Sequence, residues 1–204
     1  MDSNRPAFLD SGCECAFCIS SPMPNIYHCN KKLFWVDVPR NASSSMKDTY
    51  NWQPIQHHEI TRYGVMRPIV IYRDPVQRFV STIDHYFNGA VGRSAYGRDY
   101  FQDVLGKDML QLTPQQRVNL IFESLSELHK ISQRHHFFEQ VNYLATDYFS
   151  EYTMIPLAEA SKILNIAVSH QSVKIIGKDH FSAAQIKQIK AIYSADYEFF
   201  NIRK

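Results

Sequence analysis

The sequence predicts an α/β protein, a three-layer α/β/α arrangement in which helices cover both faces of a central parallel sheet. Two short apolar runs, residues 33–38 and 69–72, have the composition of buried strands, and each is followed by the signals of a helix start. Amphipathic helices and strand-like runs then alternate toward the C-terminus. This alternation is typical of parallel strands joined by crossover helices.

Length and composition agree with one globular domain. The chain has 204 residues, of which 45% are hydrophobic and 21% charged. The formal net charge of +2 is too small to indicate a nucleic-acid-binding surface. The apolar runs are too short to span a membrane, and residues 1–20 lack the pattern of a secretory signal, so we expect a cytoplasmic protein with no membrane span.

The first strand-like run leads into a loop whose composition suits an anion, and then into a helix predicted from about Ser45 to Trp52. Small residues let backbone N–H groups approach an anion, and a helix N-terminus carries about half a positive charge. Arg40 offers a planar guanidinium, and the hydroxyls of Ser43, Ser44 and Ser45 can donate hydrogen bonds. A serine-rich turn that only caps the helix is the alternative for this segment taken alone.

The second strand-like run is followed by another cation. Arg73 comes directly after the run, and the Asp-Pro pair that follows it suits an N-cap and a first helical turn. Ser81 lies two turns into this predicted helix, three residues after Arg78. Because ligands of open α/β sheets bind at the carboxyl ends of the strands, Arg73 and Ser81 are expected to converge on one anion there.

The remaining segments complete the predicted fold. Residues 89–106, rich in Gly, Tyr, Arg and Asp, predict an irregular loop. The apolar spacing in residues 114–130 predicts an amphipathic helix. Further along, we expect a strand end and a helix in residues 152–166, a short strand in residues 173–176 and a final amphipathic helix in residues 183–193.

Together the two loop segments resemble the sulfotransferases that use 3′-phosphoadenosine-5′-phosphosulfate (PAPS), specifically the carbohydrate type called sulfotransferase family 2. The family's 5′-phosphosulfate loop looks like Val-Pro-Lys-Asn-Ala-Ser-Thr-Ser, and the chain has Val38-Pro39-Arg40-Asn41-Ala42-Ser43-Ser44-Ser45. The family's 3′-phosphate motif looks like Arg-Asp-Pro-x-x-Arg-x-x-Ser, and it is matched by Arg73-Asp74-Pro75-Val76-Gln77-Arg78-Phe79-Val80-Ser81.

Two weaker similarities follow in the family's order, and the resemblance covers about residues 26–200. His136-Phe137-Phe138-Glu139-Gln140 is similar to a mid-chain His-Trp-Arg-Pro-Gln segment. Residues 193–200 look like the family's closing Tyr-x-x-Asp-Tyr-x-x-Phe. The resemblance implies a sulfotransferase domain of P-loop-NTPase-like fold over residues 30–204, after a cysteine-containing arm at residues 1–29.

The resemblance also implies an activity. The protein would transfer a sulfuryl group from PAPS to a hydroxyl acceptor, with a carbohydrate favoured, and would release 3′,5′-adenosine bisphosphate (PAP). The donor site would consist of Arg40, Asn41, Ala42 and the three serines of residues 43–45 for the phosphosulfate, with Arg73 and Ser81 for the 3′-phosphate. Lipid-linked sugars, small alcohols and protein tyrosine stay open as acceptors, and the oligomeric state is open as well.

The catalytic residues implied are Arg40 and a histidine base. Arg40 stands where the family usually has lysine; arginine keeps the positive charge but cannot donate a proton. His58 lies between the two motifs and His136 lies in the mid-chain segment, and either imidazole could accept the acceptor's proton. His85, on the helix after the second motif, is expected to be structural or exposed to solvent.

Two alternatives to an active sulfotransferase stay open. Because of Arg40 and the uncertain base, the chain could be a scaffold that binds PAP or PAPS and has lost turnover. An ATP-dependent phosphotransferase is disfavoured because no G-x4-G-K-[ST] loop is present.

The four cysteines all lie within the first 29 residues. Cys13, Cys15, Cys18 and Cys29, with His28 beside them, could hold zinc, but their spacing is not that of a standard zinc module. We therefore expect reduced thiols and no metal, with disulfides disfavoured by the expected compartment.

Overall fold

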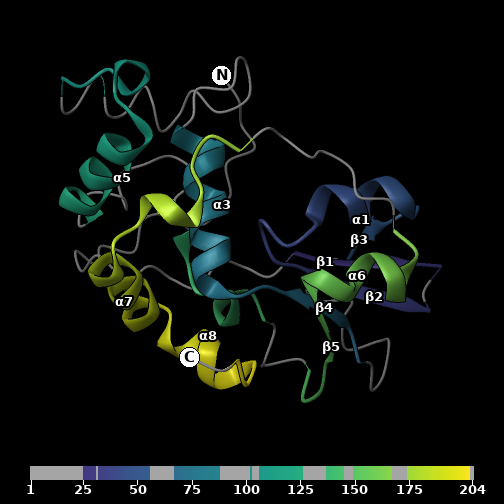
Figure 1. The fold of residues 1–204 in the computed structure, drawn as a ribbon. Coiled ribbons are helices and arrows are strands. Elements are labelled where there is room, and N and C mark those ends of the chain that lie inside the picture. Colours follow the sequence, from purple (N-terminus) through teal and green to yellow (C-terminus); the bar gives the residue numbers. More distant parts are fainter. Residues whose placement is uncertain are drawn as a thin grey trace, which may run out of the picture.

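The computed structural model describes residues 25–30, 32–55, 67–87, 102, 106–125, 137–144, 149–166 and 174–202. Over these ranges the fold is α/β, with a five-stranded sheet beside a group of helices (Figure 1). The strands are β1 (Asn25–Cys29), β2 (Leu33–Asp37), β3 (Gln53–Pro54), β4 (Ile69–Tyr72) and β5 (Thr153–Pro156). The α-helices are α1 (Ser43–Thr49), α3 (Pro75–Phe87), α5 (Pro114–Glu123), α6 (Leu157–Leu164), α7 (Ala183–Ile192) and α8 (Ser194–Phe199). The described residues also form the short 3-10 helices η2 (Met109–Gln111), η5 (Gln140–Tyr143) and η6 (Lys178–His180).

The α/β class is confirmed, but the sheet is mixed, whereas a parallel sheet was expected. The strand order is β3-β1-β2-β4-β5, and only the pairs β2–β4 and β4–β5 are parallel. β1 pairs antiparallel with both β2 and β3. The parallel half therefore contains the two strand-like runs that precede the predicted anion loops. β1 lies in the stretch assigned to the N-terminal arm, so the sheet begins before residue 30.

Alternating side chains of β2 and β4 enter two different cores, as expected of strands buried on both faces. One core joins the sheet to α1 and α6, and its fully or nearly buried members are Trp35, Met46, Ile69, Ile71, Ile155, Ala160 and Ile166. The other core covers the opposite face with η5 and the end of α8; its members include Phe34, Val36, Val70, Tyr143, Leu144 and Phe200. In the described residues, the second face is thus covered by a 3-10 turn and the chain end, where a layer of α-helices was expected.

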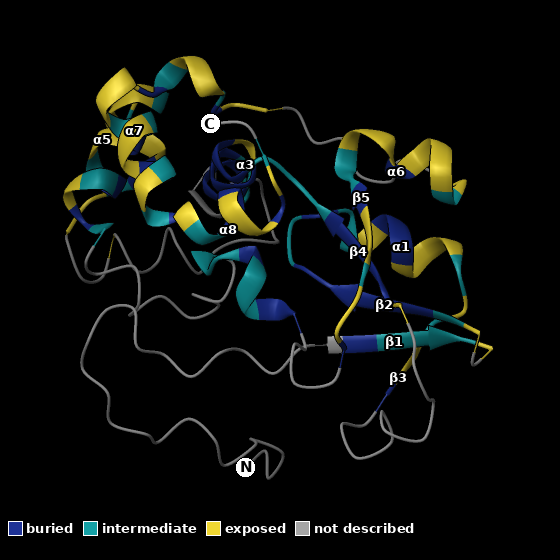
Figure 2. Cartoon of the chain, turned by 90° about the horizontal axis from the view of Figure 1, so that it is seen from below, coloured by how far each residue is buried: buried dark blue, intermediate teal, exposed yellow. Residues whose placement is uncertain are grey.

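The third core lies beside the sheet, where α3, α5, α7 and η6 pack together (Figure 2). The helix α3 is almost entirely buried on its inner side and begins at Pro75, which fits the first turn of a helix. Thr113 and Ser182 form capping boxes at the starts of α5 and α7. The helix predicted in residues 114–130 ends at Glu123 as an α-helix.

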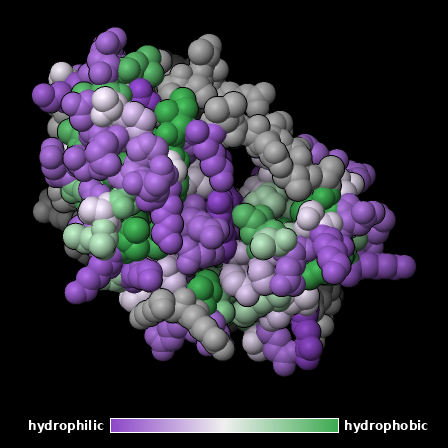
Figure 3. All heavy atoms as spheres, in the orientation of Figure 1, coloured by the Kyte–Doolittle hydropathy of each residue, from purple (hydrophilic) through white to green (hydrophobic). Residues whose placement is uncertain are grey.

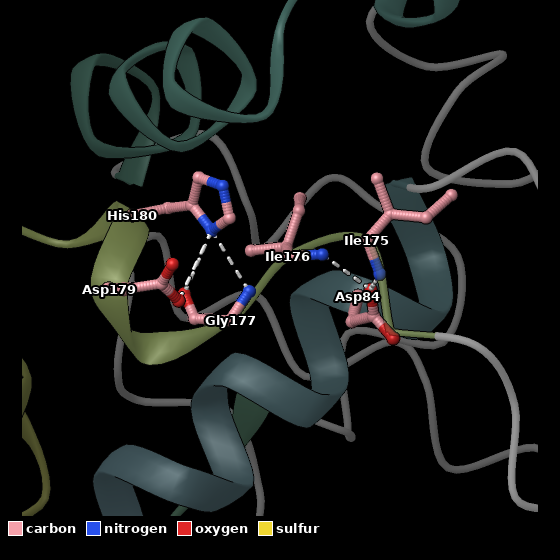
Figure 4. Close-up of polar contacts among 6 residues, drawn as sticks. All are labelled: Asp84, Ile175, Ile176, Gly177, Asp179 and His180. Carbon is pink, nitrogen blue, oxygen red and sulfur yellow. Dashed lines mark hydrogen bonds and ion pairs between the residues drawn. The ribbon is translucent and has the colours of Figure 1, made fainter.

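The short strand predicted in residues 173–176 is absent from its described part, residues 174–176. The carboxylate of Asp84 on α3 instead accepts backbone hydrogen bonds from Ile175 at 3.0 Å and Ile176 at 2.9 Å (Figure 4). This contact satisfies two backbone N–H groups of the segment without a neighbouring strand. The next turn is closed by Gly177, whose N–H donates to the Nδ1 atom of His180 at 3.1 Å.

Within the described ranges, no helix has both the length and the apolar composition needed to cross a lipid bilayer.

Candidate functional site

The two predicted anion loops leave neighbouring parallel strands at the same edge of the sheet. Residues 38–42 follow β2 and lead to α1, and residues 73–74 follow β4 and lead to α3. In Figure 3, drawn from the same side as Figure 1, the surface is hollowed between the part that holds α3 and the part that holds α1, with hydrophilic side chains on the helical side. This edge is the usual place for ligands of α/β sheets.

The backbone of the first loop is held in an unusual conformation. Arg40 has φ 69° and Ala42 has φ 64°, so two non-glycine residues lie in the left-handed region on either side of Asn41. Each such residue costs about 1–2 kcal/mol relative to ordinary backbone. Strain of this kind is concentrated at functional sites. Hydrogen bonds from Asn41 N to Val38 O and from Met46 N to Ala42 O hold the turn in place.

The two loops meet directly through Arg40 and Ser81, which are 41 residues apart in the sequence. The Nη2 atom of Arg40 donates to the hydroxyl of Ser81 at 3.0 Å and to its backbone oxygen at 3.2 Å. The residues assigned to the 5′ and 3′ ends of one nucleotide are therefore neighbours.

Arg78, the middle residue of the second motif, lies between the loops and is only 1% exposed. Its Nε atom donates to the oxygen of Pro39 at 3.1 Å, and its Nη1 atom donates to the oxygen of Phe138 at 2.6 Å. Its guanidinium also lies over the ring of Tyr143, 5.9 Å from the centroid. Arg78 therefore fixes the first loop against η5, and its charge adds to the positive potential of the site.

Arg73, like Arg78, has a buried guanidinium nitrogen with an unmet hydrogen-bonding requirement, since the Nη2 atom of Arg78 also has no partner among the described residues. The Nε atom of Arg73 is buried and has no hydrogen-bond partner within the described ranges. Burial lowers the pKa of the Arg73 guanidinium, and the charges of Arg40 and Arg78 lower it further, against an opposing effect from Asp74. A guanidinium stays charged in proteins, so three positive charges gather where an anion would relieve their repulsion.

The serines of the first loop differ in their environments. The Ser43 hydroxyl donates to Asp37 at 2.5 Å, and Asp37 also forms an ion pair with Lys47 at 2.8 Å. Because a hydroxyl has one proton, Ser43 can offer a ligand its backbone N–H and a lone pair. Ser44 is exposed and Ser45 is 6% exposed. Sequence reasoning missed the role of Asp37, which depends on a contact across a turn.

Asn41 is buried behind the loop and is tied to the sheet. Its Nδ2 atom donates to the oxygen of Ile71 at 2.9 Å and to the side chain of Gln140 at 2.6 Å. Asn41 therefore shapes the loop through its side chain, and only its backbone is left for an anion.

His85 is half-buried and lies close enough to the site for the charge of Arg40 to affect it, although the sequence indicated a structural or solvent-facing residue. Burial, and then the charge of Arg40, lower the pKa of His85 to about 4, against an opposing effect from Asp84. At neutral pH the imidazole is therefore uncharged. The sequence could have indicated that His85 lies near the site, because His85 follows Ser81 by four residues, about one helical turn.

Three other predicted groups lie outside the described residues: the candidate bases His58 and His136, and the cysteines at positions 13, 15 and 18. Cys29 is a free thiol in β1, and no cluster of metal-ligand side chains occurs in the described part of the chain.

Comparisons of the chain with protein-family models, with curated proteins and with solved structures gave no match. A function is therefore inferred from the residues and geometry of the site.

Proposed function

We propose that the chain is a PAPS-dependent sulfotransferase that acts on a hydroxyl acceptor, with a carbohydrate favoured. The observation that carries the proposal is the convergence of Arg40, Arg73 and Ser81 at the carboxyl ends of β2 and β4. The buried Nε atom of Arg73, which has no hydrogen-bond partner in the described part of the chain, fits a phosphate oxygen better than it fits a purely structural role.

The donor would lie across the two loops. Arg73 and Ser81 would bind the 3′-phosphate, and Arg40 with the backbone of residues 41–45 would bind the 5′-phosphosulfate. PAPS supplies an activated sulfuryl group, whose bond to the bridging phosphate oxygen breaks as a bond to the acceptor oxygen forms. Arg40 would stabilise the negative charge on the departing phosphate, while the acceptor proton goes to a base, for which His58 and His136 remain the candidates.

A second function is favoured by the nature of Arg40. Arginine balances charge but cannot protonate a leaving group, and its guanidinium is already hydrogen-bonded to Ser81. A PAP- or PAPS-binding scaffold without turnover would need the same binding residues and none of the proton transfer.

The deciding experiment is calorimetric titration of the full chain with PAP, AMP and ATP. We expect micromolar binding of PAP and much weaker binding of AMP, because AMP lacks the 3′-phosphate that Arg73 would bind. No binding of PAP to folded protein would overturn both functions. If PAP binds, incubation with labelled PAPS and a panel of hydroxyl acceptors separates them, since only the enzyme transfers label.

A further inference from the structure

A network of buried polar side chains connects the candidate site to the C-terminal part of the chain. Its members are Asn41 behind the first loop, Gln140 at the start of η5 and Asp196 on α8, which are 1%, 0% and 0% exposed, respectively. Gln140 is 99 residues from Asn41 and 56 residues from Asp196 along the sequence. None of these side chains is reachable by solvent or ligand, so each acts through its neighbours.

Gln140 pairs with Arg73 as a neighbouring strand would. Its Oε1 atom accepts from the backbone N–H of Arg73 at 3.0 Å, and its Nε2 atom donates to the backbone oxygen of Arg73 at 2.8 Å. The pairing between β2 and β4 ends before this point, with Val36 opposite Val70. The side-chain amide therefore continues the hydrogen-bond ladder past the end of β4 and fixes the residue that presents the unpaired guanidinium Nε.

Asp196 fixes which way round this amide lies. One carboxylate oxygen accepts from the Nε2 atom of Gln140 at 3.1 Å, and the other accepts from the backbone N–H of Val141 at 3.0 Å. Because a carboxylate only accepts, the Nε2 atom of Gln140 must face Asp196, which leaves its Oε1 atom facing Asn41 and Arg73. The hydrogen bonds of Gln140 to Asn41, Arg73 and Asp196 all agree with this one orientation.

We infer that Asp196 and Gln140 are positioning residues for the candidate 3′-phosphate site, through which α8 sets the placement of Arg73. The inference rests on the proposed function for the identity of the ligand, but the hydrogen-bond network itself does not depend on it. In this inference the helix α8 acts on the site through the contact of Asp196 with Gln140.

Asp196→Asn tests the inference with a nearly isosteric change. Asparagine has one acceptor oxygen for two donors, so a donor must face either Val141 N–H or Gln140 Nε2. If the amide of Gln140 turned over to avoid this clash, its NH2 group would face the N–H of Arg73. In every arrangement, therefore, two N–H donors face each other, and the hydrogen bonds of the network are weakened.

The matched control is Glu139→Gln. Glu139 also joins the start of η5 to the start of α8, because its carboxylate accepts from the N–H of Ala195 at 3.3 Å. The same single negative charge is removed, and an acceptor oxygen is kept for Ala195. Removing either charge should favour anion binding electrostatically, so weaker binding in the Asp196 variant alone cannot come from the change in charge.

Two measurements on the full chain decide the matter. Without ligand, amide hydrogen exchange at Arg73 should be about tenfold faster in Asp196→Asn than in the wild type or in Glu139→Gln. In calorimetry, the preference for PAP over AMP should fall by about tenfold in Asp196→Asn and stay unchanged in the control. A general loss of structure would weaken both nucleotides, so equal weakening would overturn the inference.

The inference is also overturned if exchange at Arg73 is unchanged while exchange at Val141 accelerates, because Asp196 would then be only a local cap of η5. If the wild type fails to bind PAP, the proposed function is wrong. The exchange measurement without ligand still tests whether Asp196 positions Arg73 through Gln140. If Asp196→Asn does not fold, PAP added to the wild type should slow exchange at Val141, since coupling is reciprocal. Protection at Arg73 without any at Val141 would contradict the coupling.

Discussion

Replacing Arg73 by methionine should change ligand affinity and protein stability in opposite directions. Methionine keeps a long apolar stem of similar length and removes the guanidinium. One charge-assisted contact to phosphate contributes about 1.5–3 kcal/mol, so the dissociation constant for PAP should rise about 10- to 100-fold. The ligand-free protein should not lose stability, because the buried Nε atom has no hydrogen-bond partner among the described residues and faces like charges from Arg40 and Arg78.

An unsatisfied buried donor costs about 1–3 kcal/mol, so recovery of about 1 kcal/mol is a conservative expectation. In a chain of this size that corresponds to a rise of about 2–4 °C in melting temperature. Calorimetric titration and thermal unfolding measure the two quantities on the same samples. The control is Arg67→Met at the other end of β4, where an exposed ion pair with Glu151 contributes at most about 1 kcal/mol. A lower melting temperature for Arg73→Met, or unchanged PAP affinity, would refute the reasoning.

Three further substitutions test the electrostatics and the backbone of the site. Because the pKa of His85 is lowered to about 4, the unfolded chain binds more protons than the folded chain between about pH 6.5 and pH 4, so stability should fall as the pH falls through this window. Urea unfolding at several pH values should show a smaller loss for His85→Asn, and equal losses would contradict the assignment. Arg78→Lys should lower the free energy of unfolding by about 1.5–3 kcal/mol, because one ammonium group cannot reach both the Pro39 and Phe138 oxygens; urea unfolding with no change would show that these contacts are dispensable. Ala42→Gly should raise the melting temperature by about 2–4 °C through relief of left-handed backbone strain, and a decrease would mean that the loop is unstrained.

The parallel half of the sheet and the helix α3 were predictable from local patterns. Ile69–Tyr72 is a continuous apolar run, and Pro75 marks the helix that follows it. The antiparallel half was not predictable in this way, because β1 has a mixed composition and relies on pairing with β2. The residues between β1 and β2 contain no glycine or proline that would have indicated a turn.

For the candidate site, the motifs predicted which loops meet but not how their side chains pair. Ser43 was expected to donate to an anion, and it instead donates to Asp37, whose own partner Lys47 lies one turn into α1. Gln140 and Asp196 have no periodicity that relates them, since their contact depends on how η5 and α8 dock. Long-range polar pairing of this kind is invisible to propensity and hydrophobic pattern.

The spacing of the site's contacts along the chain has a consequence for the order in which the protein is assembled. The hydrogen-bonded partners are far apart in the sequence: Arg40 and Ser81 are separated by 41 residues, Asn41 and Gln140 by 99, and Asp74 and Tyr197 by 123. A nascent chain that has been synthesised only as far as α3 contains both anion loops. It lacks Gln140, which contacts the backbone of Arg73, and Asp196, which contacts Gln140. The proposed nucleotide binding is therefore expected only in chains that extend through α8, so that the ligand would stabilise these chains and not shorter ones.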